Sequence, residues 1–189
     1  MRRQTLDLLR IDPNEAWDPA AAVEQIRALE RYGLEVTDEA LARPVVGMIS
    51  RMVDQKGLDL IAACAGDLMA LDATYVIVGT GEPRYQDMWR ELSRWRPDRV
   101  QVFIGFDERR AHLVEGGADM FMMPSRFEPC GLNQMYSLRY GTLPLVRKVG
   151  GLADTVVDYQ PGVTGANGFV FTDYSPWVLL ETIRRALTL

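Results

Sequence analysis

The sequence predicts an α/β protein built on an open parallel sheet of about six strands flanked by helices. Six short apolar runs follow residue 44, and their starts lie about 20 to 30 residues apart. Each run is apolar at successive positions, which indicates strands that are covered on both faces. The intervals leave room for a helix between successive strands, which is the spacing of βαβ units.

The predicted elements follow one another in a regular order. The strands are the apolar runs at 45–49, 75–78, 100–104, 120–123, 143–146 and 169–171. The clearest helix follows Gly57, because apolar residues between Leu58 and Met69 recur at helical spacing. Further helices are predicted at 85–95, 108–115, 132–140 and 176–187. The last begins with Ser175 and Pro176, a favourable cap and first helical residue.

Residues 1–43 have a different pattern. Prolines and a glycine interrupt them, and only 20–32 carries helical periodicity. We interpret 1–43 as a lead-in segment with one helix, and 44–189 as the domain. The chain ends at Leu189, at the end of a predicted helix and without a capping glycine, so we expect a piece of a longer protein.

Composition excludes several classes of function. Lys and Arg number 21 against 26 Asp and Glu, with no basic cluster, so a nucleic-acid partner is not expected. No apolar stretch approaches the roughly 20 residues of a membrane span, and no secretion signal is visible. Two cysteines and one histidine cannot form a usual zinc site or a disulfide framework. We therefore expect a cytoplasmic protein without a metal or cofactor.

Ligands of open parallel sheets bind beyond the carboxyl ends of the strands, so the residues after each apolar run are candidates. Arg51 and Lys56 follow the first run, on a predicted loop, and could clamp a diphosphate. A solvated loop is the alternative. Residues 79–81, Gly-Thr-Gly, form either a binding loop or a plain turn, and they lack the rest of a dinucleotide or P-loop motif.

Two later residues allow a structural and a functional interpretation. Phe106 follows the third run, where it could stack on a base, although phenylalanines more often belong to the core. His112 lies in the next predicted helix, and no serine or cysteine partner can be assigned to it from the sequence. A structural role is therefore favoured for this histidine.

The segment 124–134, which follows the fourth run, carries most of the expected chemistry. A carboxylate is costly to desolvate, so Glu128 is expected to be held by partners or by a polyol ligand. The alternative is a carboxylate at a helix N-terminus. Backbone amides around Gly131 to Asn133 would favour an anion in the cleft. Cys130 has no visible base, so a nucleophilic role is not favoured. A sugar nucleotide needs both the recognition of a polyol and the binding of a phosphate.

Five segments together resemble the C-terminal half of bacterial glycogen synthase and plant starch synthase. They are 50–58, 78–81, 124–132, 139–144 and 150–156, in matching order and spacing. The resemblance covers roughly residues 44–189 and implies one Rossmann-like half of a GT-B fold. That family transfers glucose from ADP-glucose to the non-reducing end of an α-1,4-glucan, with retention of configuration and without a metal. The chain resembles the donor-binding domain.

The resemblance also implies roles for individual residues. Arg51 and Lys56 would bind the donor diphosphate, Glu128 would hold glucose hydroxyls, and these three would form the catalytic set. The implied donor-binding residues are Arg51, Lys56, Gly81, Phe106, Glu128, Cys130, Gly131, Leu132 and Asn133. The sequence departs from the family at two of them, because Phe106 replaces a tyrosine beside the adenine and Asn133 replaces a threonine. Tyr136 occupies the second position of the Glu-x7-Glu pattern of related transferases.

The family context also implies partners. A complete enzyme would bind ADP or ADP-glucose and the glucan, and an N-terminal GT-B domain would carry the acceptor site and a catalytic histidine. That domain and a final C-terminal stretch are not expected in this chain. A plant or algal source would imply a plastid.

Two alternatives stay open. One is another GT-B nucleotide-sugar transferase, such as a sucrose or trehalose-type synthase, and the other is a non-catalytic nucleotide-sugar-binding remnant. The segments 130–132 and 150–152 favour the glucan synthase. The presence of Arg51, Lys56 and Glu128 favours retained ligand binding.

Overall fold

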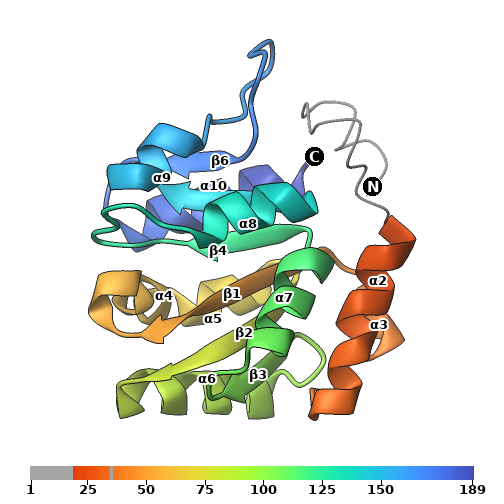
Figure 1. Ribbon diagram of the computed structural model, residues 1–189. Coiled ribbons are helices and arrows are strands. Elements are labelled where there is room, and N and C mark those ends of the chain that lie inside the picture. The colour runs from red at the N-terminus through yellow and green to blue at the C-terminus, as the bar shows by residue number, and fades with distance from the viewer. Residues whose placement is uncertain (1–18, 35) are drawn as a thin grey trace.

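The computed structural model describes residues 19–34 and 36–189 and contains the predicted parallel sheet (Figure 1). Its strands are β1 (Val45–Met52), β2 (Thr74–Gly81), β3 (Val100–Ile104), β4 (Met120–Met123), β5 (Leu143–Arg147) and β6 (Phe169–Phe171). All pairs are parallel, and the order across the six-stranded sheet is β3-β2-β1-β4-β5-β6. The fold class and all six strand positions are confirmed.

Helices cover both faces of the sheet. One layer contains α4 (Leu58–Ala63), α5 (Ala65–Ala70), α6 (Pro83–Trp95) and α10 (Pro176–Leu187). The other contains α7 (Glu108–Gly117), α8 (Asn133–Tyr140) and α9 (Gly150–Thr155). The lead-in helix α2 (Pro19–Ala28) continues into the 3₁₀ turn η2 (Leu29–Tyr32) and lies beside α7, while the short α3 (Asp38–Leu41) precedes β1 (Figure 1). No helix of the described residues is long and apolar enough to cross a membrane.

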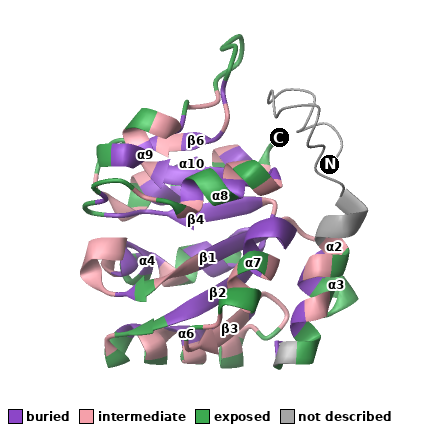
Figure 2. Cartoon of the chain, viewed as in Figure 1, coloured by how far each residue is buried: buried purple, intermediate pink, exposed green. Residues whose placement is uncertain are grey.

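The inner strands β1, β2, β4 and β5 are mostly buried, as their continuous apolar runs predict, whereas the edge strand β3 is half-buried after Val100 (Figure 2). In β2, Tyr75 and Ile77 pack with the layer of α4 to α6, whereas Val76 and Val78 pack with the α7 layer. Side chains alternate across a strand, so both sets need apolar partners. Trp89 of α6 is completely buried in the first cluster.

The described part of the lead-in segment packs against the sheet. Ile26 and Leu29 are completely buried in one cluster with Val76, Val78 and Val114. This helix therefore contributes to the core of the second layer. Residues 1–18 lie outside the described part of the chain.

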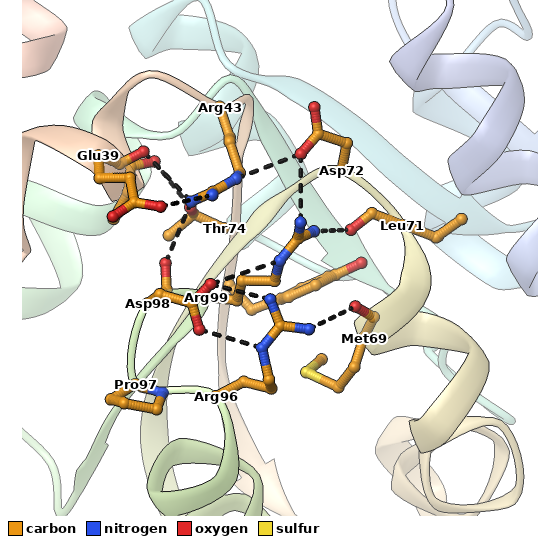
Figure 3. A network of polar contacts seen from close by, with 12 residues as sticks. Glu39, Arg43, Met69, Leu71, Asp72, Thr74, Arg96, Pro97, Asp98 and Arg99 are labelled. Carbon is orange, nitrogen blue, oxygen red and sulfur yellow. Dashed lines mark hydrogen bonds and ion pairs between the residues drawn. The ribbon is translucent and has the colours of Figure 1, made fainter.

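A network of arginines fixes the amino-terminal edge of the sheet (Figure 3). Arg43, just before β1, contacts Asp72 at 3.2 Å and donates to the Asp98 carbonyl at 3.4 Å. Arg96 pairs with Asp98 at 2.8 Å and holds the pKa of that carboxyl below its usual value. Arg99 donates to the carbonyl of Leu71. The connections that enter β1, β2 and β3 are thereby tied together, at the edge opposite the strand carboxyl ends.

Several elements differ from the sequence-based expectation. β1 and β2 extend through the polar residues that we predicted as loops, and the pairs Ser50–Gly79, Arg51–Thr80 and Met52–Gly81 continue the ladder. The helix predicted after Gly57 is divided at Cys64 into α4 and α5. The helices α3 and α9 were not predicted, since both are only one or two turns long. Ser175 lies at the N-cap of α10, but its side chain makes no capping bond.

Candidate functional site

A cavity of about 390 Å³ lies at the carboxyl edge of the sheet. There β1 pairs with β2 on one side and β4 on the other, so the strand order reverses at β1. Such a reversal opens a crevice in doubly wound sheets and is their usual ligand site. The polar and loop residues that line it are Ser50, Arg51, Lys56, Gly79, Gly105, Phe106, Ser125, Glu128, Gly131, Leu132 and Asn133.

Lys56 reaches this cavity from the 3₁₀ turn η3 (Asp54–Lys56), which follows β1. The turn ends at Gly57, whose φ of 79° suits glycine, and a Cβ there would lie 2.1 Å from the Pro124 carbonyl oxygen. The Gln55 carbonyl accepts from the Arg126 amide at 2.9 Å. The turn and the loop after β4 are therefore joined along their backbones.

Neighbouring side chains hold the turn in place. Asp54 accepts a hydrogen bond from Tyr85 of α6, which lowers the pKa of this carboxyl below its usual value, and Arg84 adds to the effect. Arg84 contacts Asp54 at 2.6 Å. These contacts restrict the position from which Lys56 extends.

Glu128, on the loop after β4, forms an ion pair with Lys56. The Glu128 side chain is only 10% exposed and that of Lys56 is 20% exposed. Ser125 Oγ donates to the same carboxylate oxygen at 3.2 Å. The expectation that partners hold this carboxylate is confirmed. The alternative of a helix N-terminal carboxylate is wrong, because α8 begins only at Asn133.

The loop that carries Glu128 lies directly on the start of α9. A Cβ at Gly150 would be 2.0 Å from the Glu128 carbonyl oxygen, and one at Gly151 would be 1.8 Å from that of Cys130. The Gly151 amide instead donates to the Glu128 carbonyl at 3.2 Å. Only glycines permit this close approach. The glycine pair therefore sets the position of the Glu128 loop.

The buried Gln134 supports the same loop from α8. Its side-chain amide donates to the carbonyls of Gly131 at 2.9 Å and Cys130 at 3.2 Å. Asn133 donates from its side chain to the Ile49 carbonyl at 3.3 Å, which ties the first residue of α8 to β1. Within 19–34 and 36–189, the backbone amides of Gly131 and Leu132 donate to no protein acceptor. They remain available to an anion at the N-terminus of the helix.

Arg51 and Phe106 line the open part of the cavity. Arg51 lies in β1, not in a loop, and donates to the Gln55 side chain at 3.1 Å. Phe106 follows β3 and is 81% exposed, so the interpretation of this ring as a core residue is wrong. An exposed ring beside a polar cavity can stack on a planar ligand.

Two implied donor-binding residues do not line the cavity. Gly81 ends β2, where a Cβ would lie 2.4 Å from the Met52 carbonyl oxygen, so strand packing accounts for its glycine. Cys130 is an exposed free thiol outside the lining. Gly79, for which the sequence left a binding loop and a plain turn open, does line the cavity. A Cβ at this position would lie 2.0 Å from the Ser50 carbonyl oxygen. The short Gly-Thr-Gly segment is the sequence pattern that indicates a site residue here.

His112 lies away from this cavity, on α7. Its Nδ1 is 3.1 Å from the Tyr140 hydroxyl and 3.8 Å from Glu115. Burial raises the pKa of Glu115 to about 7. The contact with Tyr140 joins α7 to α8, in agreement with a structural role.

Ser125 and Gln134 are site residues that sequence reasoning did not assign. Both lie within the segment 124–134, but their partners become visible only in three dimensions. The site as a whole combines two cations and free backbone amides with one buried carboxylate. The cations and the backbone amides suit phosphates, and the carboxylate suits hydroxyl donors. The described residues contain no group of three side chains that could hold a metal ion.

Comparison with known proteins agrees with this architecture. Residues 35–189 match the family model described as glycosyl transferases group 1. A glycogen synthase from Anaeromyxobacter sp. (strain K) is 55% identical over 161 residues, covering 85% of this chain and 33% of the relative. A glycogen synthase from Methylococcus capsulatus is 50% identical over 163 residues, with 85% and 32% covered. The chain thus spans about a third of the length of these curated relatives.

Solved structures give the same result. The catalytic domain of starch synthase IV from Arabidopsis thaliana, bound to ADP and acarbose, is 33% identical with a TM-score of 0.79. That match covers 90% of this chain and 36% of the other. The C-terminal domain of a group 1 glycosyl transferase from Francisella tularensis, at 21% identity and a TM-score of 0.60, shares the fold over 82% and 83% of the two chains. With the fold of a C-terminal GT-B domain and a family match over residues 35–189, the chain belongs to the group 1 glycosyl transferases.

Proposed function

We propose that this chain is the donor-binding domain of a glucan synthase that transfers glucose from ADP-glucose to the non-reducing end of an α-1,4-glucan, with retention. The observation that carries the proposal is the cavity in which Arg51, Lys56 and Glu128 converge. The similarity to a starch synthase solved with ADP and acarbose supports the choice of nucleotide and glucan. The free cysteines Cys64 and Cys130 are compatible with a cytoplasmic location.

Each part of the cavity has a role in this proposal. Arg51 and Lys56 bind the diphosphate, and the amides of Gly131 and Leu132 bind its outer phosphate. These positive groups stabilise the charge that develops on the leaving ADP. Glu128 orients the glucose through its hydroxyls. The adenine lies against the exposed ring of Phe106.

The acceptor glucan and the rest of the catalytic machinery are assigned to the part of the enzyme beyond this chain. The curated relatives are about three times as long as the matched region. A complete active site therefore needs a second domain facing this cavity. The same cavity would serve a related transferase or a binding remnant, and nucleotide preference and transfer activity separate these alternatives.

Arg51→Ala is expected to weaken ADP binding by about 1.5 to 3 kcal/mol, the contribution of a hydrogen bond to a charged group. Its side chain is exposed in the cavity wall, and within 19–34 and 36–189 it bonds to the neutral side-chain amide of Gln55, so the fold should be unaffected. Calorimetric titration with ADP measures the effect, and Arg90→Ala, which removes a half-buried arginine of α6 outside the cavity lining, is the control. Equal affinities for the wild type and Arg51→Ala would contradict the assignment.

Phe106→Ala is expected to weaken ADP binding by about 1 to 3 kcal/mol, because the nucleotide loses a stacking surface. Phe106→Tyr keeps the ring and should bind ADP almost as the wild type does. The ring is 81% exposed, so its removal should leave the free energy of unfolding nearly unchanged. Normal ADP affinity in Phe106→Ala would show that the base lies elsewhere.

A further inference from the structure

The ion pair between Lys56 and Glu128 places a negative charge beside the cation assigned to the diphosphate. We propose that this pair makes the cavity discriminate against the nucleoside diphosphate product and in favour of the intact sugar nucleotide. Glu128 is thus a specificity-determining residue that acts partly through Lys56. The inference rests on the proposed function and deepens it.

Lys56 and Glu128 neutralise each other's charge in the cavity wall. Both side chains are largely withdrawn from water, at 20% and 10% exposure, and Ser125 adds a second donor to the Glu128 carboxylate. Within the described residues, the carboxylate is held by these two donors alone. Loss of the lysine would leave it with one neutral hydroxyl. A buried carboxylate in that state is strongly disfavoured.

A diphosphate competes for the same ammonium group. It either draws Lys56 away from Glu128 or shares it, and in both cases phosphate charge comes close to the carboxylate. The repulsion is poorly screened, since the pair is mostly buried. Arg51 carries no such penalty, because its side-chain partner among the described residues is the neutral amide of Gln55. The cost of binding a diphosphate is therefore concentrated at Lys56.

The sugar of an intact donor removes this cost. Its hydroxyl groups can donate to Glu128 and replace the ammonium that the diphosphate has taken. ADP has no group to offer there, so the carboxylate remains unsatisfied after the sugar has left. The ion pair consequently lowers the affinity for ADP more than the affinity for ADP-glucose. Release of ADP is favoured without any movement of the backbone.

The experiment measures the affinities of ADP and ADP-glucose for the wild type and for Glu128→Gln. We expect Glu128→Gln to bind ADP about tenfold more tightly than the wild type, which corresponds to about 1.4 kcal/mol. Its affinity for ADP-glucose should rise less or fall. The ratio of the ADP to the ADP-glucose dissociation constant therefore falls, by about tenfold where the affinity for ADP-glucose is unchanged.

Two controls separate this effect from a general change of charge. Asp59→Asn removes a carboxylate three residues from Lys56 that pairs with Arg126 instead, and it should leave the ratio unchanged. Lys56→Met combined with Glu128→Gln should lose the gain in ADP affinity, because the cation is gone. Should Glu128→Gln fail to fold, Glu128→Ala is expected to show the same rise in ADP affinity.

The outcomes separate a failure of the ion-pair inference from a failure of the proposed function. Weaker or unchanged ADP binding by a folded Glu128→Gln, with normal binding by the wild type, overturns the ion-pair inference and leaves the proposed function intact. Absence of ADP and ADP-glucose binding by the wild type and every variant overturns both. An equal change in the ratio for Asp59→Asn also overturns the inference.

Discussion

The 189-residue chain, purified and incubated alone with labelled ADP-glucose and glycogen, is expected to elongate the glucan about 10⁵-fold to 10⁸-fold more slowly than a complete relative. Transfer requires the acceptor hydroxyl within near-attack distance of the donor sugar, and such positioning lowers the barrier by about 7 to 11 kcal/mol. In the proposed function, the chain supplies one wall of that site. Phe106 and Leu132 at its edge are exposed to water, so slow hydrolysis of the donor is the most that we expect.

Complementation tests the reason for this inactivity. The chain is mixed with a fragment of the Anaeromyxobacter glycogen synthase that lacks the matched region, and incorporation of glucose is measured again. Any recovered activity should require Glu128 and Arg51 of this chain. Rapid elongation by the chain alone, abolished in Glu128→Ala, would contradict the view that it forms only half of an active site.

Lys56→Met is expected to lower the free energy of unfolding by about 3 kcal/mol, since it leaves Glu128 buried without its cation. The Glu128 side chain is 10% exposed, and Ser125 alone cannot replace a charged donor. Urea denaturation, monitored by circular dichroism, measures the change through the shift of the midpoint. The same variant should bind ADP more weakly than the wild type.

The matched control for this prediction is the double variant Lys56→Met with Glu128→Gln. It removes both charges and keeps the side-chain volumes close to the original, so most of the lost stability should return. ADP binding should not return with it. Equal stability of the single and double variants would show that the ion pair does not determine how this loop folds.

The sheet could be predicted from the sequence because strands covered on both faces leave continuous apolar runs. Their ends could not, since Ser50 and Arg51 are polar yet still pair with β2. Ligand-binding edges of strands carry polar residues, and a hydrophobicity pattern assigns these to loops. The helix α9 could not be predicted because it begins with Gly150 and Gly151, and glycine is a poor helix former. Both glycines are needed for the close contact with the loop after β4.

The charged residues of the candidate site could be predicted from the sequence, whereas Ser125, Gln134 and the contacts among the site residues could not. Arg51, Lys56 and Glu128 each follow a predicted strand, and strand carboxyl ends meet at one edge. The ion pair joins residues 72 positions apart, and no local pattern indicates it. Gly81 shows the converse, because a glycine in a binding motif proves to be required by packing on Met52.

The most direct test of the proposed donor site is a crystal structure of this chain with ADP. We expect the diphosphate between Arg51 and Lys56, the outer phosphate near the amides of Gly131 and Leu132, and the adenine against Phe106. ADP bound outside this cavity, or inside it with the diphosphate away from both cations, would contradict the assignment.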